Sequence, residues 1–148
     1  MPRKFASVPF CVSGNLTTRF PTVTFLCENC DVFSIHCYQP AEEMQKFVDL
    51  MKTFNRPIFC TEYLARPFGS TFETVLPVLK KDKVAAYDFG LVRGAMQCHY
   101  GWNKVDKDGN KIPYTEEPDP WFHDIFQSDG TPYRPAEVEF IKSMTGRD

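Results

Sequence analysis

The sequence predicts an α/β protein with parallel strands, and two observations carry that prediction. Short apolar runs, each nearly continuous, alternate along the chain with segments of helical periodicity. Continuous apolar runs are typical of parallel strands covered on both faces, and strand–helix alternation indicates βα units. At 148 residues the chain has the length of one domain, which we place at residues 1–148.

The four expected strands are 6–14, 31–38, 56–63 and 83–92. A helix is expected after Pro40, because apolar residues then recur at spacings of three and four; they are Met44, Phe47, Val48 and Met51. A second helix is expected after a capping box formed by Ser70 and Glu73. Pro77 falls inside that helix and predicts a kink or an early break.

The rest of the chain consists of a long irregular segment and a last helix. Residues 93–134 are rich in Gly, Pro, Trp and Tyr and contain an expected turn at 107–110. Long structured loops are usually functional. The last helix is expected to open at Pro135, to bury Val138, Ile141 and Met144, and to end at Gly146.

Composition narrows the function classes. The net charge of −2 gives no reason to expect a nucleic-acid partner, and no apolar run approaches membrane-spanning length. The start of the chain shows no secretory signal. The six cysteines fall partly inside apolar runs, which favours structural thiols and a reducing compartment. "CENC" has no second ligand pair and the three histidines are scattered, so we expect neither a metal site nor a cofactor.

Glu62 poses the main question, because it ends the apolar run of the third expected strand. A buried carboxylate is costly unless it is paired or hydrogen-bonded. Ligands of parallel α/β proteins bind at the carboxyl ends of the strands. The side chains expected there or just beyond are His36, Tyr38, Glu62, Tyr63, Arg66, Asp88, Phe89, Arg93, Gln97, His99, Tyr100 and Trp102. Acidic and aromatic groups together favour a site for a polar, ring-shaped ligand.

These segments carry a resemblance. "SIHCYQPAEEMQKFVDLMKTFNRPIFCTEYLARPFGSTFETVLPVLKK", "AAYDFGLVRGAMQCHYGW" and "EPDPWFHDIFQSDGTPYRPAEVEFIKSMTG" resemble the last three βα units of the clan A glycoside hydrolases, close to families 2 and 5. The first strand of the chain would be the fifth strand of that (β/α)8 barrel. The resemblance implies a carbohydrate substrate with β linkages, and xylan, cellulose, mannan and galactosides all stay open because related barrels act on each of them.

The resemblance also implies roles for single residues. Glu62 would be the nucleophile of a retaining mechanism. His36 and Tyr38 would orient it, and Tyr100 and Trp102 would line a sugar subsite. Further substrate contacts would come from Tyr63, Arg66 and Phe89.

Two departures from the family pattern accompany the resemblance. A complete barrel needs about 250 residues, so this chain has room for only a half barrel of four strands. The missing half would contain the Asn-Glu pair that supplies the general acid/base. Phe89 also stands where the family usually has tryptophan.

A half barrel leaves two sheet edges uncovered, and a second copy is the simplest remedy, so we expect a homodimer. The acid/base would then come from a partner chain, the second copy or Asp88. Two other functions stay open: an inactive half barrel that self-associates or binds carbohydrate, and one half of a split or truncated enzyme.

Structural roles also stay open for the candidate residues. Glu62 would then pair with Arg66 or Arg56, and His36 would be a buried, satisfied histidine. Asp88 is expected to be a satisfied polar group. His99 and His123 are expected at the surface or in loops, and Trp121 in the core.

Overall fold

The computed structural model describes residues 5–8, 25, 27–102 and 104–146. Its centre is a four-stranded, wholly parallel sheet formed by β1 (Phe5–Val8), β2 (Val32–His36), β3 (Ile58–Glu62) and β4 (Ala85–Ala86). The strands lie in the sheet in the order in which they occur in the chain. The predicted α/β class with parallel strands is therefore confirmed. The half-barrel interpretation stays a prediction.

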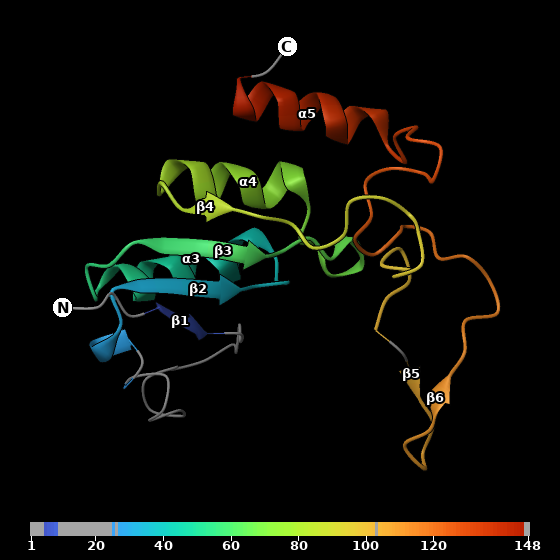
Figure 1. The fold of residues 1–148 in the computed structure, drawn as a ribbon, viewed down its shortest axis with the longest axis horizontal. Coiled ribbons are helices and arrows are strands. Elements are labelled where there is room, and N and C mark those ends of the chain that lie inside the picture. The colour runs from blue at the N-terminus through green and yellow to red at the C-terminus, as the bar shows by residue number, and fades with distance from the viewer. Residues whose placement is uncertain (1–4, 9–24, 26, 103, 147–148) are drawn as a thin grey trace.

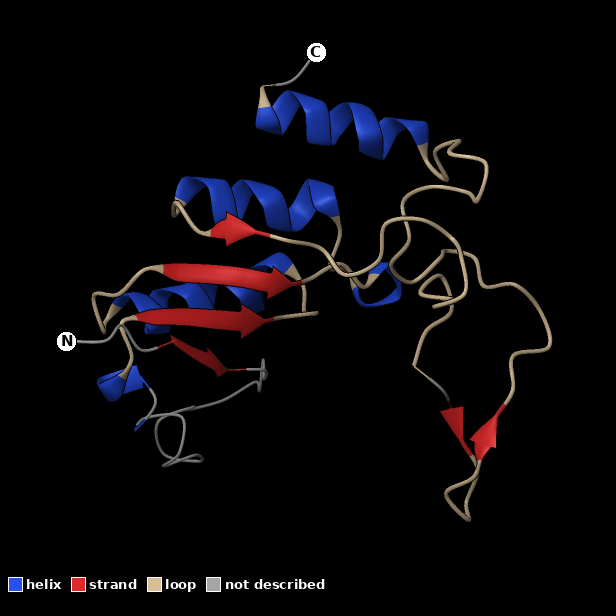
Figure 2. Cartoon of the chain, viewed as in Figure 1, coloured by secondary structure: helices blue, strands red, loops and turns tan. Residues whose placement is uncertain are grey.

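The helices pack on the sheet and on one another (Figures 1 and 2). They include α3 (Ala41–Lys52), the 3-10 turn η1 (Arg66–Phe68), α4 (Phe72–Lys81) and α5 (Pro135–Thr145). Helix α3 contacts β3, helix α4 contacts β4, and α5 packs against α4 as an outer layer. Gly146 ends α5 in the left-handed region with a φ of 69°, as the sequence predicts.

The hydrophobic core lies between the sheet and helices α3 and α4. Its fully buried members include Phe33, Ile35, Cys60, Met44, Val48, Met51, Val75 and Leu79. Other side chains of β2 and β3, together with Tyr87 just after β4, border a hollow of about 580 Å³, which is lined by Val32, Phe59, Thr61 and Tyr87. We call these four residues the inner-face patch. Because successive side chains of a strand point to opposite faces, one strand can serve both the core and this patch.

Three element predictions need correction. The last strand is only Ala85–Ala86 rather than 83–92, and the chain reaches a left-handed conformation at Gly90, whose φ is +93°. The N-cap of α4 is Thr71, which forms the capping box with Thr74, whereas the Ser70 hydroxyl accepts a hydrogen bond from the buried N–H of Leu64. Helix α4 also continues through Pro77 to Lys81, so the early break is wrong.

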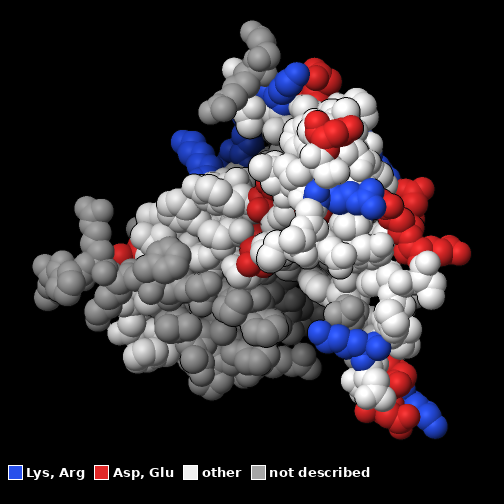
Figure 3. Space-filling view, turned by 45° about the vertical axis from the view of Figure 1, so that its right-hand side comes forward, with Lys and Arg blue, Asp and Glu red and all other residues white. Residues whose placement is uncertain are grey.

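The segment after β4 lies beyond the carboxyl ends of the strands, at the arrowheads of Figure 1. It carries a small hairpin, β5 (Lys104–Val105) with β6 (Lys111–Ile112), closed by the predicted turn. On the face shown in Figure 3, acidic and basic side chains are interspersed over the upper and right-hand parts of the molecule. Among the described residues, no helix has both the length and the apolar character needed to cross a membrane.

Candidate active site

Glu62 is held by two neighbouring side chains at the end of β3. The Tyr38 hydroxyl donates to Glu62 Oε2 at 2.5 Å, and His36 Nδ1 lies 3.2 Å from the same oxygen. The Glu62 side chain is 28 % exposed and that of His36 is 22 % exposed, so both groups remain within reach of solvent. Glu62 is thus paired and hydrogen-bonded, but with Tyr38 and His36 rather than with either expected arginine.

A local irregularity of the sheet produces this pairing. The register between β2 and β3 shifts after Ile35, so that His36 stands opposite Glu62 and not opposite Thr61. The ladder then continues, because the N–H of Cys37 donates to the Glu62 carbonyl at 2.9 Å. Bulges of this kind re-aim side chains and are frequent beside active sites.

Tyr38 acts on Glu62 as a proton-bearing donor. Burial, followed by the hydrogen bond to Glu62 and the charge of Glu62, raises the pKa of Tyr38 well above its ordinary value. The phenol therefore keeps its proton across the whole neutral range and remains a hydrogen-bond donor to Glu62. A charge-assisted hydrogen bond of this type is about twice as strong as one between neutral groups.

An aromatic cleft of about 570 Å³ opens beside this cluster. Its lining includes Phe89, Tyr100, Trp102, Tyr114 and His123. The Tyr38 ring joins the cleft to Glu62, because it lies 5.2 Å from the Trp102 ring and 5.3 Å from the His123 ring, measured between centroids. The structure thus brings Glu62, His36, Tyr38, Phe89, Tyr100 and Trp102 to one end of the sheet.

Trp102 is the most accessible aromatic residue of this lining, with 56 % of its surface exposed. A second, mostly apolar hollow of about 410 Å³ shares Gly101, Trp102 and Tyr114 with the cleft. Gly101 is needed where they meet, because a Cβ there would lie 2.8 Å from the Phe122 ring and 2.9 Å from the Tyr114 hydroxyl oxygen. Ring faces of this kind suit the apolar faces of pyranose sugars.

His123 lies in the irregular 93–134 segment, in line with the loop part of its prediction, but it is buried there, at 4 % exposure. Its Nδ1 lies 2.5 Å from the carbonyl oxygen of Leu64, two residues after Glu62. Since a carbonyl only accepts, Nδ1 carries the proton and Nε2 carries the lone pair. Burial lowers the pKa of His123 more than its hydrogen bond and the nearby Asp124 and Glu62 raise it. His123 is therefore neutral at pH 7.

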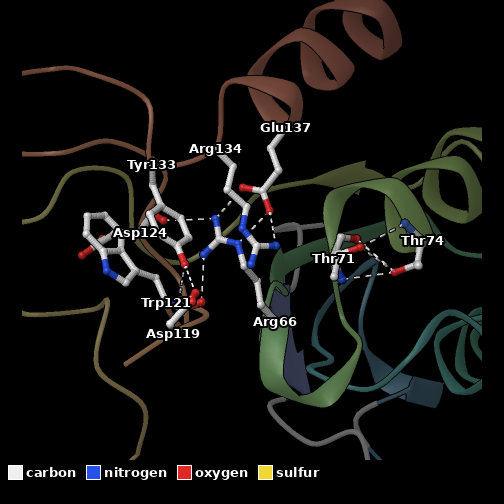
Figure 4. Close-up of polar contacts among 9 residues, drawn as sticks. All are labelled: Arg66, Thr71, Thr74, Asp119, Trp121, Asp124, Tyr133, Arg134 and Glu137. Carbon is white, nitrogen blue, oxygen red and sulfur yellow. Dashed lines mark hydrogen bonds and ion pairs between the residues drawn. The ribbon is translucent and has the colours of Figure 1, made fainter. Parts of the chain in front are cut away.

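Two predicted site residues are engaged elsewhere. Arg66 is 5 % exposed and forms a two-bond ion pair with Glu137, with Nε–Oε1 at 2.8 Å and Nη2–Oε2 at 2.7 Å (Figure 4). Its guanidinium also donates to the carbonyls of Trp121 and Asp124, each at 3.1 Å. Tyr63 is buried with its ring against Phe72. Both residues support the fold around the site, and we leave them out of the proposed site.

Four other residues near the cleft have surroundings that suit a structural role. Burial raises the pKa of Asp88, whose charged neighbours are Arg66 and Asp124. His99 is buried within the 93–134 loop segment, with Nδ1 3.5 Å from Asp124 Oδ2. Trp121 is buried in line with the prediction. Cys98 lines the cleft, but burial raises the pKa of its thiol, so it is a poor candidate for a thiolate nucleophile.

Sequence reasoning missed His123 as a functional candidate. One signal was present, since His123 lies in the long 93–134 segment that was expected to be functional. Its partner Leu64 is 59 residues away in the chain, so the fixed tautomer emerges only from the fold.

The fold and this cluster define the class of protein: a parallel α/β domain with a hydrogen-bonded glutamate and an aromatic cleft at the carboxyl ends of its strands. Neither a protein-family model nor a curated protein sequence matches the chain. The likeness to clan A glycoside hydrolases therefore rests on the residues quoted above.

Proposed function

We propose that this chain is a glycoside hydrolase-like protein that acts on β-linked glycans, with Glu62 as the nucleophile of a retaining mechanism. One observation carries the proposal: Glu62 ends a parallel strand, is oriented by Tyr38 and His36, and adjoins an aromatic cleft. The Glu62 carboxylate would attack the anomeric carbon of a sugar and form a glycosyl–enzyme ester.

The surroundings of Glu62 suit this role. The Tyr38 hydroxyl holds the carboxylate by a hydrogen bond and His36 lies beside it, while the Glu62 side chain stays 28 % exposed. Trp102, Phe89 and Tyr100 offer ring faces for the sugar, and Tyr38 connects them to Glu62. A positioned nucleophile next to an aromatic binding surface supports the proposal of covalent catalysis.

Covalent labelling tests the nucleophile directly. A 2,4-dinitrophenyl 2-deoxy-2-fluoro-β-glycoside has a leaving group that departs without protonation, so labelling does not require a general acid. We expect incubation with gluco- and xylo-configured reagents to add one fluoroglycosyl group, which peptide mapping places on Glu62. Glu62→Gln should abolish labelling and leave the circular dichroism spectrum unchanged.

Glu73→Gln is the matched control, because Glu73 is an exposed glutamate in the first turn of α4. It should label at the wild-type rate. The proposed mechanism would be refuted if the wild type labels with no reagent of the panel. It would also be refuted if labelling survives in Glu62→Gln.

A second candidate function is carbohydrate binding without catalysis. Asp88 has Arg66 as a charged neighbour and Asp124 lies beside His99, so within the described residues these two carboxyl groups have surroundings of their own, which favours this alternative. In this case xylan or cellulose oligosaccharides should bind equally well to the wild type and to Glu62→Gln in calorimetry. Trp102→Ala should weaken binding in both.

We also propose that two copies associate, since the described sheet has β1 and β4 as its outer strands and an apolar inner-face patch. An N-terminal half from another chain is the remaining way to complete a barrel.

A further inference from the structure

We propose that His123 is the general base of this site, and that it activates the water that releases the sugar from Glu62. The inference rests on the proposed function, because it needs a glycosyl group on Glu62. It assigns within this chain the proton-transfer role for which the sequence offers no Asn-Glu pair.

The first argument is the tautomer. The Leu64 carbonyl accepts from Nδ1 of His123, so the lone pair is on Nε2. Within the described part of the chain, Nε2 has no hydrogen-bond partner, although the residue lines the cleft. A fixed imidazole with a free lone pair at a cleft wall is suited to accept a proton from water.

The second argument is position. The His123 ring contacts Tyr38, which binds Glu62, and also Phe89, at centroid distances of 5.3 and 5.4 Å. Leu64, which holds the imidazole, follows Glu62 by two residues and adopts a φ of +75°. That conformation is uncommon for a leucine, and such strain clusters at functional sites. The nucleophile and the base are thus fixed by one short segment, 62–64.

The protonation state agrees with this role. The charged groups that act on His123 are Asp124 in its own segment, Arg66 in η1 and Glu62 in β3. Burial outweighs the carboxylates, so the pKa of His123 is lowered and the ring is neutral at pH 7. A neutral imidazole is a competent base and a poor acid. The chain should therefore act on glycosyl donors whose leaving groups depart without protonation.

Water releases the sugar by a single displacement at the anomeric carbon. The water oxygen forms a bond to the anomeric carbon while the bond from that carbon to the Glu62 oxygen breaks. The electron pair of the broken bond returns to the Glu62 carboxylate. The proton of the water moves to Nε2 of His123, which later releases it to solvent.

Azide rescue tests this step on the full-length chain. His123→Asn places an amide N–H where Nδ1 stood, so it keeps a donor for Leu64 while it removes the rest of the imidazole with the lone pair of Nε2. With a 2,4-dinitrophenyl β-glycoside, this variant should show a burst of one dinitrophenolate per site, followed by turnover reduced about 10²- to 10⁴-fold. Azide, an anion that needs no base, should restore turnover and yield a glycosyl azide. Wild-type turnover should not respond to azide.

Each other outcome is decisive. Two results would overturn the role of His123 and leave the proposed function standing. One is labelling at Glu62 together with normal turnover in His123→Asn. The other is labelling at Glu62 together with slow turnover that azide does not restore. Failure of the wild type to label would remove both. If the asparagine variant does not fold, His123→Gln replaces it in the same experiment. If azide instead restores turnover in Asp88→Asn, the base is Asp88.

Discussion

At the scale of single residues, the Tyr38–Glu62 hydrogen bond is the contact whose removal tells most about the site. Tyr38→Phe removes the hydroxyl and keeps the ring that contacts Trp102. We expect labelling of Glu62 to slow about 10- to 100-fold, since a hydrogen bond to a charged group contributes roughly 1.5–3 kcal/mol. Equal labelling rates, with equal thermal unfolding curves, would show that the Tyr38 hydroxyl does not orient the nucleophile.

His123 should also leave a signature in the pH dependence of stability. Because its pKa is lowered on folding, the unfolded chain binds more protons than the folded one between that lowered value and about 6.5. The free energy of unfolding should therefore rise with pH through this window. Urea titrations at several pH values should show a smaller rise in His123→Asn.

The difference in pH dependence between the wild type and His123→Asn reports on His123 alone. The raised pKa of Asp88 has the opposite effect, since it makes the free energy of unfolding fall as pH rises from about 3.8. Asp88 is present in both proteins, so its contribution cancels in the difference. Identical pH profiles would contradict the lowered pKa of His123.

The ion pair of Arg66 with Glu137 should be the most costly polar contact to break. Both side chains are almost wholly buried, at 1 % and 3 % exposure (Figure 4). Glu137→Gln leaves the guanidinium without a counter-charge, and we expect a loss of about 3–5 kcal/mol in the free energy of unfolding, measured with urea. Glu139→Gln, which breaks an exposed pair with Lys142 on the same helix, should change stability little.

The double variant Arg66→Met/Glu137→Met separates charge from hydrogen bonding. It removes the unpaired charge, but the carbonyls of Trp121 and Asp124 lose their donor. Recovery should therefore be partial. Full recovery would mean that these two carbonyl contacts contribute nothing.

At the scale of the elements, local sequence patterns predicted those strands and helices whose causes are local. Helix α3 follows from its apolar spacing, and α5 from Pro135 and Gly146. The cap of α4 was misplaced by one residue because Ser70 and Thr71 are both good caps. Tertiary structure decided between them, since the Ser70 hydroxyl is used by the buried N–H of Leu64.

This difference gives a prediction for the cap. Thr71→Ala should cost about 1 kcal/mol of stability, because it removes the side-chain half of the capping box, whereas Thr71→Gly should cost only a few tenths. Urea denaturation of the two variants measures both values. An unchanged midpoint in Thr71→Ala would show that the box does not stabilise α4.

At the scale of the whole molecule, the sequence predicted only the part of the site that lies at the ends of individual strands. Glu62, His36 and Tyr38 end adjacent parallel strands, so their convergence follows from the strand order. The placement of His123 and Arg66 does not, because their partners Leu64 and Glu137 lie 59 and 71 residues away in the chain. Contacts of that range depend on the path of the 93–134 loop, which no short motif encodes.

Self-association is the prediction that concerns the whole molecule. The inner-face patch includes Tyr87, which is 54 % exposed and whose neighbours are Val32, Phe59 and Thr61. A second copy would cover this apolar surface and both outer strands, so light scattering should give a mass of twice 17.1 kDa. Tyr87→Lys places a charge in that contact and should yield a folded monomer.

The matched control is Ile112→Lys, which puts the same charge on an exposed apolar residue of the β5–β6 hairpin and should leave the dimer intact. A folded monomer in the wild type at micromolar concentration would refute the dimer. If the monomer nevertheless labels at Glu62, nucleophilic attack requires only the described cluster. Labelling that appears only in the dimer, and disappears in Tyr87→Lys, would instead show that the second copy completes the site.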